Sequence, residues 1–582
     1  MSSTTTTTVR LWAPRASRVD LVLGDERVAM SPDVGGWWSA ATPIERTARG
    51  YAFSLDGGSP RPDPRSSWQP DGVHAPSRLV DHAAFAWTDR GWQPPPLSTG
   101  VIYELHVGTF TPAGTFEAAI ERLDHLVSLG VSHVELMPVA QFSGEHGWGY
   151  DGVALGAPHE AYGGPTGLKR LVDACHARGL AVLLDVVYNH LGPVGNYLAE
   201  FAPYFTERHH TPWGAAVNLG EPEVRGFVID NACGWLRDYH LDGLRLDAIH
   251  ALRDDSATHL LEELASAVRV LEGGLGRPLT LIAESDLNDP RVVRPPALGG
   301  YGLDAQWNED FHHALHAVLT GERGGYYADF GQLADVATAL AEGLVYAGRH
   351  SRYRGRPHGF PASGLSGHAF VGCLQNHDQV GNRARGDRIG HLVSPGRLRI
   401  GSALVLTAPF VPMLFQGEEW GASAPFQYFT DHADPDVARA VREGRRREFA
   451  AFGEDPETVP DPQARETFLR SKLDWAERAR APHAAVLDWY RRLIALRRAQ
   501  PALRSGRLDA VRVATDEGAR WLTMEREGLT VACNLADQAR CVPLARGRPR
   551  TMLLTSSADV ALGADCVDLS PESVVVLGGP AS

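Results

Sequence analysis

The stretch at residues 241–250, Leu-Asp-Gly-Leu-Arg-Leu-Asp-Ala-Ile-His, alternates apolar residues with the charged residues Arg245 and Asp247. Alternation with a period of two is typical of a β-strand, so both charged side chains are expected on the same face. A guanidinium one pleat away favours the ionised form of Asp247. Because a buried ion pair contributes little to stability, the pair indicates either a reactive site or a strand-end salt bridge.

Three further apolar runs end in carboxylates and imidazoles. The sequence reads Asp-Val-Val-Tyr-Asn-His at 185–190, reaches Glu284 after an apolar run, and reads Gln-Asn-His-Asp-Gln at 375–379. Hydrolysis of a glycoside with retention needs a nucleophilic carboxylate and a protonated carboxyl group about 5 to 5.5 Å apart. Asp247 suits the nucleophile, and Glu284 suits the acid because apolar surroundings raise the pKa of a carboxyl group.

The other polar residues at these ends suit contacts to a sugar. Asp378 is expected to be an ionised carboxylate that holds hydroxyl groups and stabilises positive charge at the anomeric carbon, and His190 and His377 are expected to donate hydrogen bonds. Each residue alone has a simpler interpretation: Glu284 caps the following helix, and His190 is structural. Asp185 is more readily explained as a cap or a salt-bridge partner than as a catalytic group.

The elements that position these residues alternate between short apolar runs and helical patterns. This order predicts an α/β fold with a parallel (β/α)8 barrel, in which the loops after the carboxyl ends of the strands form the active site. Beside the strand that carries Asp247, strands are expected at 101–107, 131–137, 180–187, 278–283, 303–307, 369–374 and 411–415. Helices are expected at 115–129, 166–178, 221–239, 255–271 and 483–498.

The sequence on both sides of the barrel changes to short period-two runs between Gly, Pro and Asp turns, which is typical of β-sandwiches. We expect an N-terminal immunoglobulin-like β-sandwich, similar to glucan-binding modules, over residues 1–93. The catalytic barrel follows over 94–503, and a C-terminal β-sandwich over 504–582. The Pro-rich stretch at 91–97 is interpreted as a stiff linker.

The composition of the chain disfavours several classes of binding partner. A net charge of −14, with 56 Lys and Arg against 70 Asp and Glu and no basic block, disfavours nucleic acid. No stretch approaches the length of a membrane span, so no membrane contact is expected. Asn189 is either a loop residue or a calcium ligand, and since no dense Asp cluster surrounds it, we expect no metal and no cofactor. Six cysteines without metal-ligand spacing predict reduced thiols in a cytoplasmic protein, with a Cys533–Cys541 bond as the disfavoured alternative.

The four strand-end segments resemble the four short regions of the α-amylase superfamily, in the same order. The segments are DVVYNH (185–190), GLRLDAIH (243–250), IAES (282–285) and QNHDQ (375–379). The resemblance implies retaining α-glucan chemistry, with Asp247 as nucleophile, Glu284 as acid and base, and Asp378 as stabiliser of the transition state. It also implies sugar contacts from His190, Arg245 and His377, and from Tyr150, which would stack on the reacting sugar.

Further strings are similar to one family within that superfamily, the maltooligosyltrehalose trehalohydrolases. The strings are WQPDGVH (68–74), HVGTFTPAGTF (106–116), NEDFHH (308–313), FQGEEW (415–420), PFQYFTDH (425–432) and SKLDW (471–475). This likeness implies cleavage of the α-1,4 bond next to a terminal trehalose unit, releasing trehalose and a maltooligosaccharide. By the same likeness Trp213, Glu309 and Asp310 are candidates for recognising the trehalose end, with core packing or a rim salt bridge as the alternative for each.

The resemblance also implies a pathway partner, a maltooligosyltrehalose synthase that makes the substrate maltooligosyltrehalose and need not bind this chain. Two other functions stay open. One is a glucan branching enzyme, which shares the fold and the nucleophile but transfers the chain to a sugar hydroxyl. The other is a non-catalytic glucan-binding protein, because a fold alone does not establish turnover. No family residue matches the Gly- and Pro-rich segment 352–366, so its role is left without a prediction.

Overall fold

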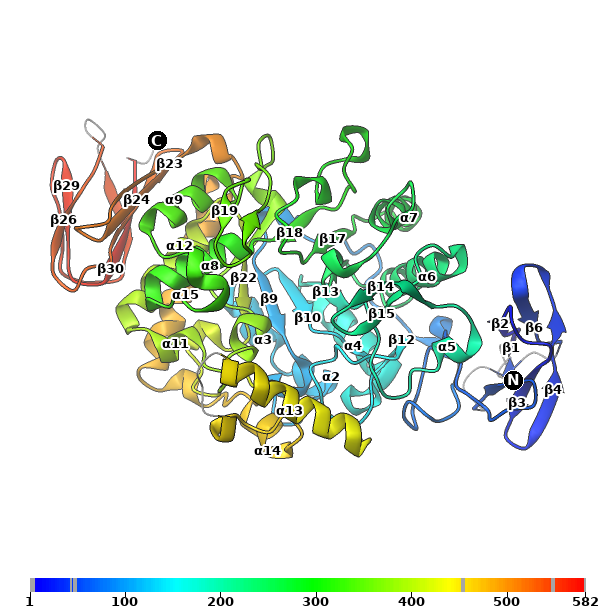
Figure 1. Ribbon diagram of the computed structural model, residues 1–582. Helices are drawn as coiled ribbons and strands as arrows, with labels where there is room; N and C mark the ends of the chain where they lie inside the picture. Colours follow the sequence, from blue (N-terminus) through cyan, green and yellow to red (C-terminus); the bar gives the residue numbers. More distant parts are fainter. Residues whose placement is uncertain (1–5, 42–43, 46–49, 452–455, 546–549, 580–582) are drawn as a thin grey trace.

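The computed structural model describes residues 6–41, 44–45, 50–451, 456–545 and 550–579. Eight parallel strands close into a barrel in the middle of the molecule, and helices surround it (Figure 1). The predicted (β/α)8 barrel is therefore confirmed. In barrel order the strands are β9 (Ile102–Leu105), β10 (His133–Leu136), β13 (Ala181–Val186), β16 (Gly243–Leu246), β17 (Thr280–Ala283), β18 (Ala305–Trp307), β21 (Phe370–Cys373) and β22 (Val411–Phe415).

The predicted helices are present, with two differences. The helix expected at 115–129 is two helices, α2 (Phe116–Ile120) and α3 (Leu123–Leu129). The helix expected at 255–271 begins later, because the Asp254 carboxylate accepts hydrogen bonds from the backbone N–H groups of Ser256 and Leu260 and holds the preceding residues in a loop. The other predicted helices are α4 (Gly164–His176), α6 (Pro222–Asp238) and α15 (His483–Ala499), and the delayed helix is α7 (Leu260–Leu275).

The barrel interior changes from apolar to charged along the strands. Ile102, Leu183 and Ile282 belong to one buried apolar cluster inside the barrel. Two residues further along β9 and β13, the same faces carry Glu104 and Asp185, both almost fully buried. The charged layer thus lies toward the carboxyl ends of the strands, which is the end where barrel enzymes carry out their chemistry.

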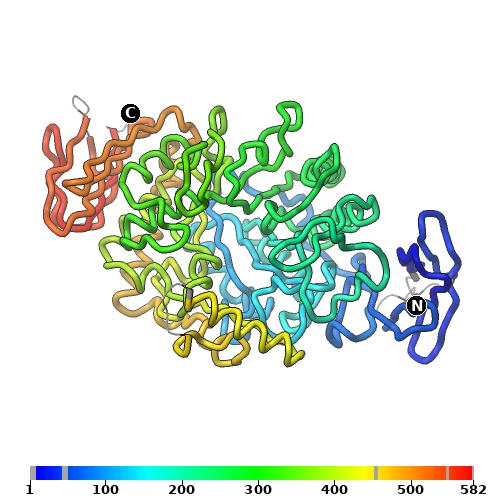
Figure 2. The backbone as a smooth tube through the Cα atoms, viewed as in Figure 1, coloured from blue at the N-terminus to red at the C-terminus, as the bar shows by residue number. Residues whose placement is uncertain are grey.

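Antiparallel sheets flank the barrel at opposite ends of the molecule, the N-terminal sheets drawn in blue and the C-terminal sheets in red (Figures 1 and 2). The N-terminal region has two three-stranded sheets and a two-stranded sheet of β1 (Thr6–Thr7) and β7 (Ile44–Glu45). The C-terminal region pairs a five-stranded with a three-stranded sheet around a buried apolar cluster. The predicted boundaries at 93/94 and 503/504 remain predictions. The N-terminal strands, sheet by sheet, are β2 (Arg10–Trp12), β6 (Trp37–Ser39) and β5 (Ser31–Pro32), then β4 (Glu26–Ala29), β3 (Val19–Leu23) and β8 (Ala52–Leu55); the C-terminal strands are β23 (Val511–Asp516), β24 (Trp521–Arg526), β25 (Leu529–Asn534), β30 (Ser573–Gly578) and β27 (Thr551–Thr555), then β26 (Arg540–Pro543), β29 (Cys566–Leu569) and β28 (Val560–Leu562).

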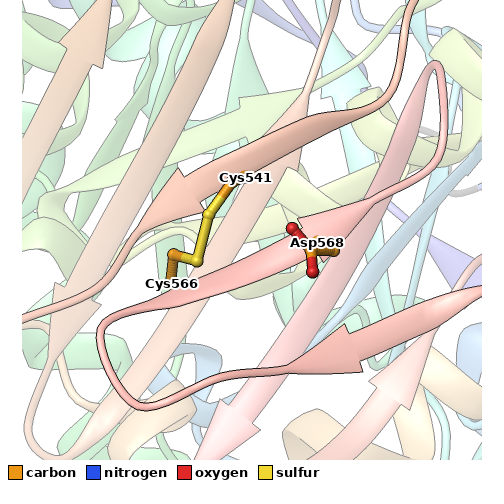
Figure 3. A group of neighbouring side chains, drawn as sticks. All are labelled: Cys541, Cys566 and Asp568. Carbon is orange, nitrogen blue, oxygen red and sulfur yellow. A yellow bond between two sulfur atoms is a disulfide. The ribbon is translucent and has the colours of Figure 1, made fainter.

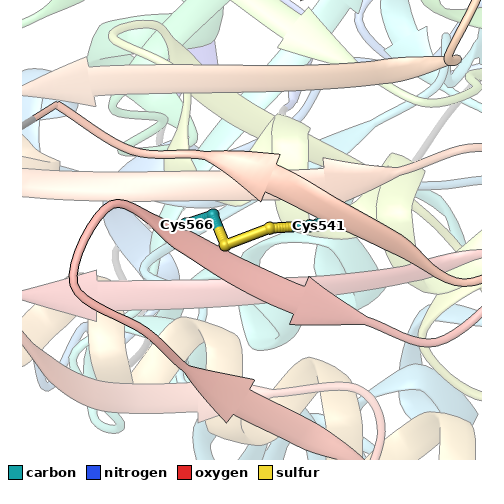
Figure 4. Close-up of a disulfide and its surroundings, with 2 residues drawn as sticks. All are labelled: Cys541 and Cys566. Atoms are coloured by element: carbon teal, nitrogen blue, oxygen red, sulfur yellow. A yellow bond between two sulfur atoms is a disulfide. The ribbon is translucent and has the colours of Figure 1, made fainter.

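The prediction of reduced thiols is wrong for two of the six cysteines. Cys541 on β26 and Cys566 on β29 form a disulfide, with their Cα atoms 5.7 Å apart, whereas Cys533 is buried and unpaired (Figures 3 and 4). The reason is the antiparallel pairing of β26 with β29, which sets Pro543 opposite Cys566 and Cys541 opposite Asp568. Spacing along the chain does not reveal such a register.

Two features bear on binding partners. Among the described residues, the one group of His, Cys, Asp and Glu side chains close enough together to hold a metal ion is Cys541, Cys566 and Asp568. Its two sulfur atoms are joined in the disulfide, so they are not free thiolate ligands (Figure 3). In the described ranges, none of the helices has both the length and the apolar character needed to cross a membrane.

Candidate active site

Arg245 lies at the centre of the charged layer and is fully buried. Its Nη1 donates to both oxygens of Asp185 at 2.9 Å and to Asp247 Oδ1 at 2.7 Å. Its Nη2 lies 3.7 Å from Glu284 Oε2, and the guanidinium carbon lies 4.1 Å from the ring centre of Trp307. One cation therefore contacts carboxylates from three consecutive barrel strands. The prediction that Arg245 and Asp247 share a face is confirmed.

Asp247 is held from a second side by the loop after β13. Asn189 Nδ2 donates to Asp247 Oδ2 at 3.0 Å, so this amide contacts the carboxylate directly. Directly after Asp247 the chain turns through Ala248, whose φ of 39° is a left-handed conformation that alanine rarely adopts. This turn aims the Ala248 N–H at Glu284 Oε2, 2.6 Å away. The strained turn thus connects the backbone next to Asp247 with the carboxyl group of Glu284.

Glu284 has surroundings that favour its protonated form. Burial raises the pKa of Glu284 well above its usual range, Arg245 opposes this rise, and the carboxylates of Asp247 and Asp378 add to it. The prediction that its surroundings raise this pKa is confirmed. A carboxyl group that stays protonated near neutral pH can act as a general acid.

Asp378 and His377 open α10 (His377–Gly381), the short helix after β21. Glu104 accepts hydrogen bonds from the backbone N–H and from the ring Nδ1 of His377. Burial alone would lower the pKa of His377, but the carboxylates of Glu104 and Asp378 raise it to about 9, so the ring is cationic at neutral pH. The Asp378 side chain is 38% exposed, against 10% for Asp247 and 13% for Glu284, so it is the most accessible of the three.

Tyr150 joins the histidine to the arginine cluster. The hydroxyl of Tyr150 lies 2.7 Å from His377 Nε2 and donates to Asp185 Oδ2 at 2.5 Å. Burial, which outweighs the charge of Arg245, raises the pKa of Asp185 to about 6. Asp185 thus acts as a salt-bridge partner, as its simpler interpretation predicted. Glu104, His377, Tyr150, Asp185 and Arg245 form one continuous chain of hydrogen bonds across the barrel.

His190 and Trp213 extend the site to one side. Their rings are stacked with centres 4.4 Å apart and planes 6° apart. Trp213 lies in the turn between β14 (Phe205–Thr211) and β15 (Gly214–Val217) and is 50% exposed, whereas His190 is buried. A half-exposed indole stacked on His190 provides a flat apolar face of the kind that binds a sugar ring.

Glu309 and Asp310 begin α8 (Glu309–Thr320), but their side chains have different surroundings. Burial and the nearby Asp378 carboxylate raise the pKa of Glu309 to about 7, and Gln379 Nε2 donates to Glu309 Oε2 at 3.1 Å. Asp310 Oδ2 instead accepts hydrogen bonds from Asn288 Nδ2 and from the backbone N–H groups of Val345 and Tyr346, at 2.6 to 2.8 Å. This geometry favours a structural role for Asp310.

The segment 352–366 has a clear place in the structure. Arg354 Nη1 forms an ion pair with Asp286 Oδ2 at 2.9 Å, and the ring Nε2 of His358 lies 2.7 Å from the Asp286 carbonyl oxygen. The Phe360 N–H donates to the carbonyl of Asn288 at 3.0 Å. The segment is therefore bonded to the loop that follows Glu284 and forms a wall beside it.

Known proteins share both the sequence and the fold. The α-amylase catalytic-domain model matches residues 82–213, and a domain of unknown function, DUF3459, matches 506–576. The malto-oligosyltrehalose trehalohydrolase of Rhizobium sp. (strain M-11) is 50% identical over 97% of both chains, and that of Arthrobacter ramosus is 55% identical over 84% of this chain and 87% of its own. This chain belongs to the malto-oligosyltrehalose trehalohydrolase family.

Two further comparisons cover different shares of this chain. A crystal structure from Salmonella typhimurium superimposes with a TM-score of 0.91 and 40% identity, covering 99% of this chain and 98% of its own. The 1,4-alpha-glucan branching enzyme of Corynebacterium jeikeium is 30% identical over 52% of this chain and 48% of its own. The likeness to the trehalohydrolase family spans nearly the whole chain, whereas the likeness to the branching enzyme spans about half.

Sequence reasoning missed Glu104, whose carboxylate holds both the backbone and the ring of His377 in this trehalohydrolase-family chain. The signal was present, because Glu104 is a charged residue inside the apolar run 101–107, the same feature that drew attention to Arg245. It also missed Trp148, whose ring packs edge-on against His377 with centres 5.6 Å apart. Nothing in its local sequence distinguishes Trp148 from an ordinary core residue.

Proposed function

We propose that this chain hydrolyses the α-1,4-glucosidic bond next to the terminal trehalose of maltooligosyltrehalose, with retention, in trehalose biosynthesis. The observation that carries the proposal is the pair of carboxyl groups on one buried guanidinium, Asp247 at 2.7 Å and Glu284 at 3.7 Å. One of the two is paired and anchored, and the other has a raised pKa. This is the division of roles that a retaining glycosidase requires.

In the first step Asp247 Oδ attacks the anomeric carbon while Glu284 gives its proton to the glycosidic oxygen of the departing trehalose. Arg245 and Asn189 hold the nucleophile by hydrogen bonds to its two oxygens. The products are free trehalose and a maltooligosyl ester of Asp247. In the second step Glu284, now ionised, takes a proton from water, which attacks the ester and releases the maltooligosaccharide.

The remaining residues are proposed to bind and stabilise. Asp378 would stabilise positive charge at the anomeric carbon, while cationic His377, whose Nδ1 is bonded to Glu104, would offer its Nε2–H to the same sugar. Tyr150 and His190 would contact the reacting sugar, and Trp213 and Glu309 would contact the trehalose side. Asp310 enters the proposal only as the residue that holds the 345–346 backbone beside the site.

The proposal includes an upstream enzyme, a maltooligosyltrehalose synthase, that makes the glycosyltrehalose end and need not bind this chain. It also includes a cytoplasmic location. Four unpaired cysteines support that location, and the Cys541–Cys566 disulfide opposes it, because disulfides are rare in reducing compartments. Thiol labelling of protein from freshly lysed cells would decide between the two, since a reduced pair at 541 and 566 supports the cytoplasm.

The decisive test is a product assay with three substrates. Purified protein is incubated separately with maltooligosyltrehalose, with a maltooligosaccharide of similar length and with a longer α-glucan, and products are resolved by chromatography. We expect free trehalose from the first and little cleavage of the second. New branch points from a longer α-glucan without release of trehalose would point to a branching enzyme. No product from any of the three substrates would point to a binding protein.

A further inference from the structure

The helix α13 (Pro435–Ala451) belongs to the long connection between the last barrel strand and α15, and it lies at the lower edge of the view, below the barrel strands (Figure 1, yellow). We propose that Arg445 on this helix is a positioning residue for Asp378 and acts through the side chain of Asn382. The inference rests on the proposed function, because it assumes that Asp378 stabilises the transition state.

Arg445 is connected to Asp378 by a short chain of contacts. Its Nη2 donates to the carbonyl of Gly381 at 2.9 Å, and its Nη1 donates to Asn382 Oδ1 at 3.3 Å. Asn382 Nδ2 donates in turn to Asp378 Oδ1 at 3.3 Å. The arginine thus bonds to both the backbone and the side chain at the end of α10, the five-residue helix that begins with His377 and Asp378.

The chemistry of the three groups permits one orientation of the Asn382 amide. A guanidinium only donates hydrogen bonds and an ionised carboxylate only accepts them. The amide must therefore turn its oxygen toward Arg445 and its NH₂ toward Asp378, and the opposite orientation would place two donors together and two acceptors together. Asp378 alone already favours the NH₂, but without Arg445 the amide oxygen loses its partner and the side chain is freer to turn away. The arginine therefore holds the amide in place against Asp378.

Arg445 is itself fixed in place. Its side chain is 14% exposed, and the guanidinium carbon lies 4.8 Å from the ring centre of Tyr428 and 4.7 Å from that of Phe449. Its Nη1 also donates to Glu448 Oε2 at 3.0 Å. Aromatic faces on a partly buried guanidinium restrict its rotation as well as attracting its charge. The group can therefore act as a rigid support.

Trp148 also packs against the end of α10. A Cβ atom built on Gly381 would lie 2.0 Å from Trp148 Cζ2, so glycine is needed for this close approach. A helix this short has little stability of its own. The orientation of Asp378 thus depends on contacts from outside α10, which Trp148 and Arg445 provide.

Asp378 is also the carboxylate with the weakest anchoring. Among the described residues its side-chain contacts are Asn382 Nδ2 at 3.3 Å and His377 Nε2 at 3.5 Å, both longer than the 2.7 Å ion pair that holds Asp247. A carboxylate that is exposed and loosely bonded loses its alignment easily. A small misplacement of a group that acts in the transition state costs about 10²-fold in rate.

The test measures trehalose release from maltooligosyltrehalose by R445A, N382A and the double variant, with the thermal transition of each. We expect kcat to fall about 10- to 100-fold in each single variant, with KM changed much less. The kcat of the double variant should be no lower than that of the less active single variant, because both substitutions act on the same hydrogen bond to Asp378. R445K should recover part of kcat, since an ammonium can still donate to one of the two acceptors.

Arg447 supplies the matched control. It lies on the same helix, is 73% exposed and pairs with Glu443, so R447A should leave kcat and the thermal transition unchanged. The inference is wrong if R445A lowers the transition temperature but keeps wild-type kcat, or if the kcat losses of the two single variants multiply. D378N separates this outcome from failure of the proposed function: full activity in D378N would refute the role of Asp378, whereas an inactive D378N with a fully active R445A would refute the inference alone.

Discussion

Two buried charge clusters lie at opposite ends of the same barrel. At the amino-terminal end of the strands, Asp242 accepts hydrogen bonds at 2.8 to 2.9 Å from Trp92 Nε1, Arg277 Nη1, His176 Nε2 and the backbone N–H of Val182. At the carboxyl end, Arg245 contacts three carboxylates. Both clusters consist of ionisable side chains at strand ends, and both are removed from water.

The two clusters differ in their balance of acidic and basic side chains. The amino-terminal cluster surrounds a carboxylate with donors, and Trp92 stacks on His176 with ring centres 4.5 Å apart, so the predicted linker 91–97 is anchored to the barrel. The carboxyl-end cluster has more acids than cations, and the pKa values of Asp185 and Glu309 rise to about 6 and about 7. The amino-terminal cluster, here called the saturated cluster, stabilises the fold. The carboxyl-end cluster, here called the unbalanced cluster, keeps a carboxyl group protonated and ready to react.

The largest expected effect removes the nucleophile from the unbalanced cluster. Asp247→Ala should lower kcat about 10⁴-fold or more, because no covalent intermediate can form. Substrate binding, followed by calorimetry with maltooligosyltrehalose, should persist, and the thermal transition should not fall, because the acid excess is reduced. Turnover near the wild-type rate would show that Asp247 is not the nucleophile. It would also remove the distinction between a reactive cluster at the carboxyl end and a structural cluster at the amino-terminal end.

The second prediction breaks the saturated cluster. Asp242→Ala should lower the free energy of unfolding by about 3–5 kcal/mol, because Arg277 loses its charge partner while buried. The measurement is urea unfolding, and kcat of the folded enzyme should remain unchanged. Asp124→Ala is the control, since that carboxylate is 83% exposed in its pair with Arg178 and its removal should leave the transition nearly unchanged. A loss of kcat in Asp242→Ala without a loss of stability would contradict the division of roles.

The third prediction uses the acid excess itself. Burial and Asp378 raise the pKa of Glu309 from its usual 4.5 to about 7, so the fold disfavours its ionised form. In the wild type this costs stability as the pH rises from about 4.5 to 7. Glu309→Gln should therefore be more stable than the wild type above pH 7, with a difference that shrinks to zero below about pH 4.5. Thermal transitions of both proteins, measured across this range, check the sign. The prediction is contradicted if the transition temperature of the variant minus that of the wild type is smaller at pH 8 than at pH 4.5.

The smallest effect concerns the histidine of the saturated cluster. Burial alone would lower the pKa of His176, but its hydrogen bonds with Asp242 and Asp89 outweigh burial and raise the pKa above 6.5. Its charge therefore stabilises the fold most below pH 6.5, and this contribution is lost as the pH rises through the raised value. His176→Gln should be most destabilised at acid pH and less so at alkaline pH. Thermal transitions at pH 6 and pH 9 test this, and an equal loss at both would mean that folding does not shift the pKa of His176.

The sequence by itself determined the barrel and most of the charged layer. Alternation along 241–250 placed Arg245 and Asp247 on one face, and apolar runs that end in acids identified Glu284 and Asp378. These features are local, because a strand of given periodicity presents the same faces wherever it packs. The barrel rule then brings the strand ends together without any knowledge of register.

Only the tertiary structure decided the partners. Glu104 reaches His377 across the closure of the barrel, and Arg445 reaches Asn382 from a separate helix. Glu309 and Asp310 are neighbours in sequence, yet consecutive helical residues point in directions about 100° apart, so one lies near Asp378 and the other holds a loop. Such contacts depend on how elements pack and on strand register, and local spacing along the chain encodes neither.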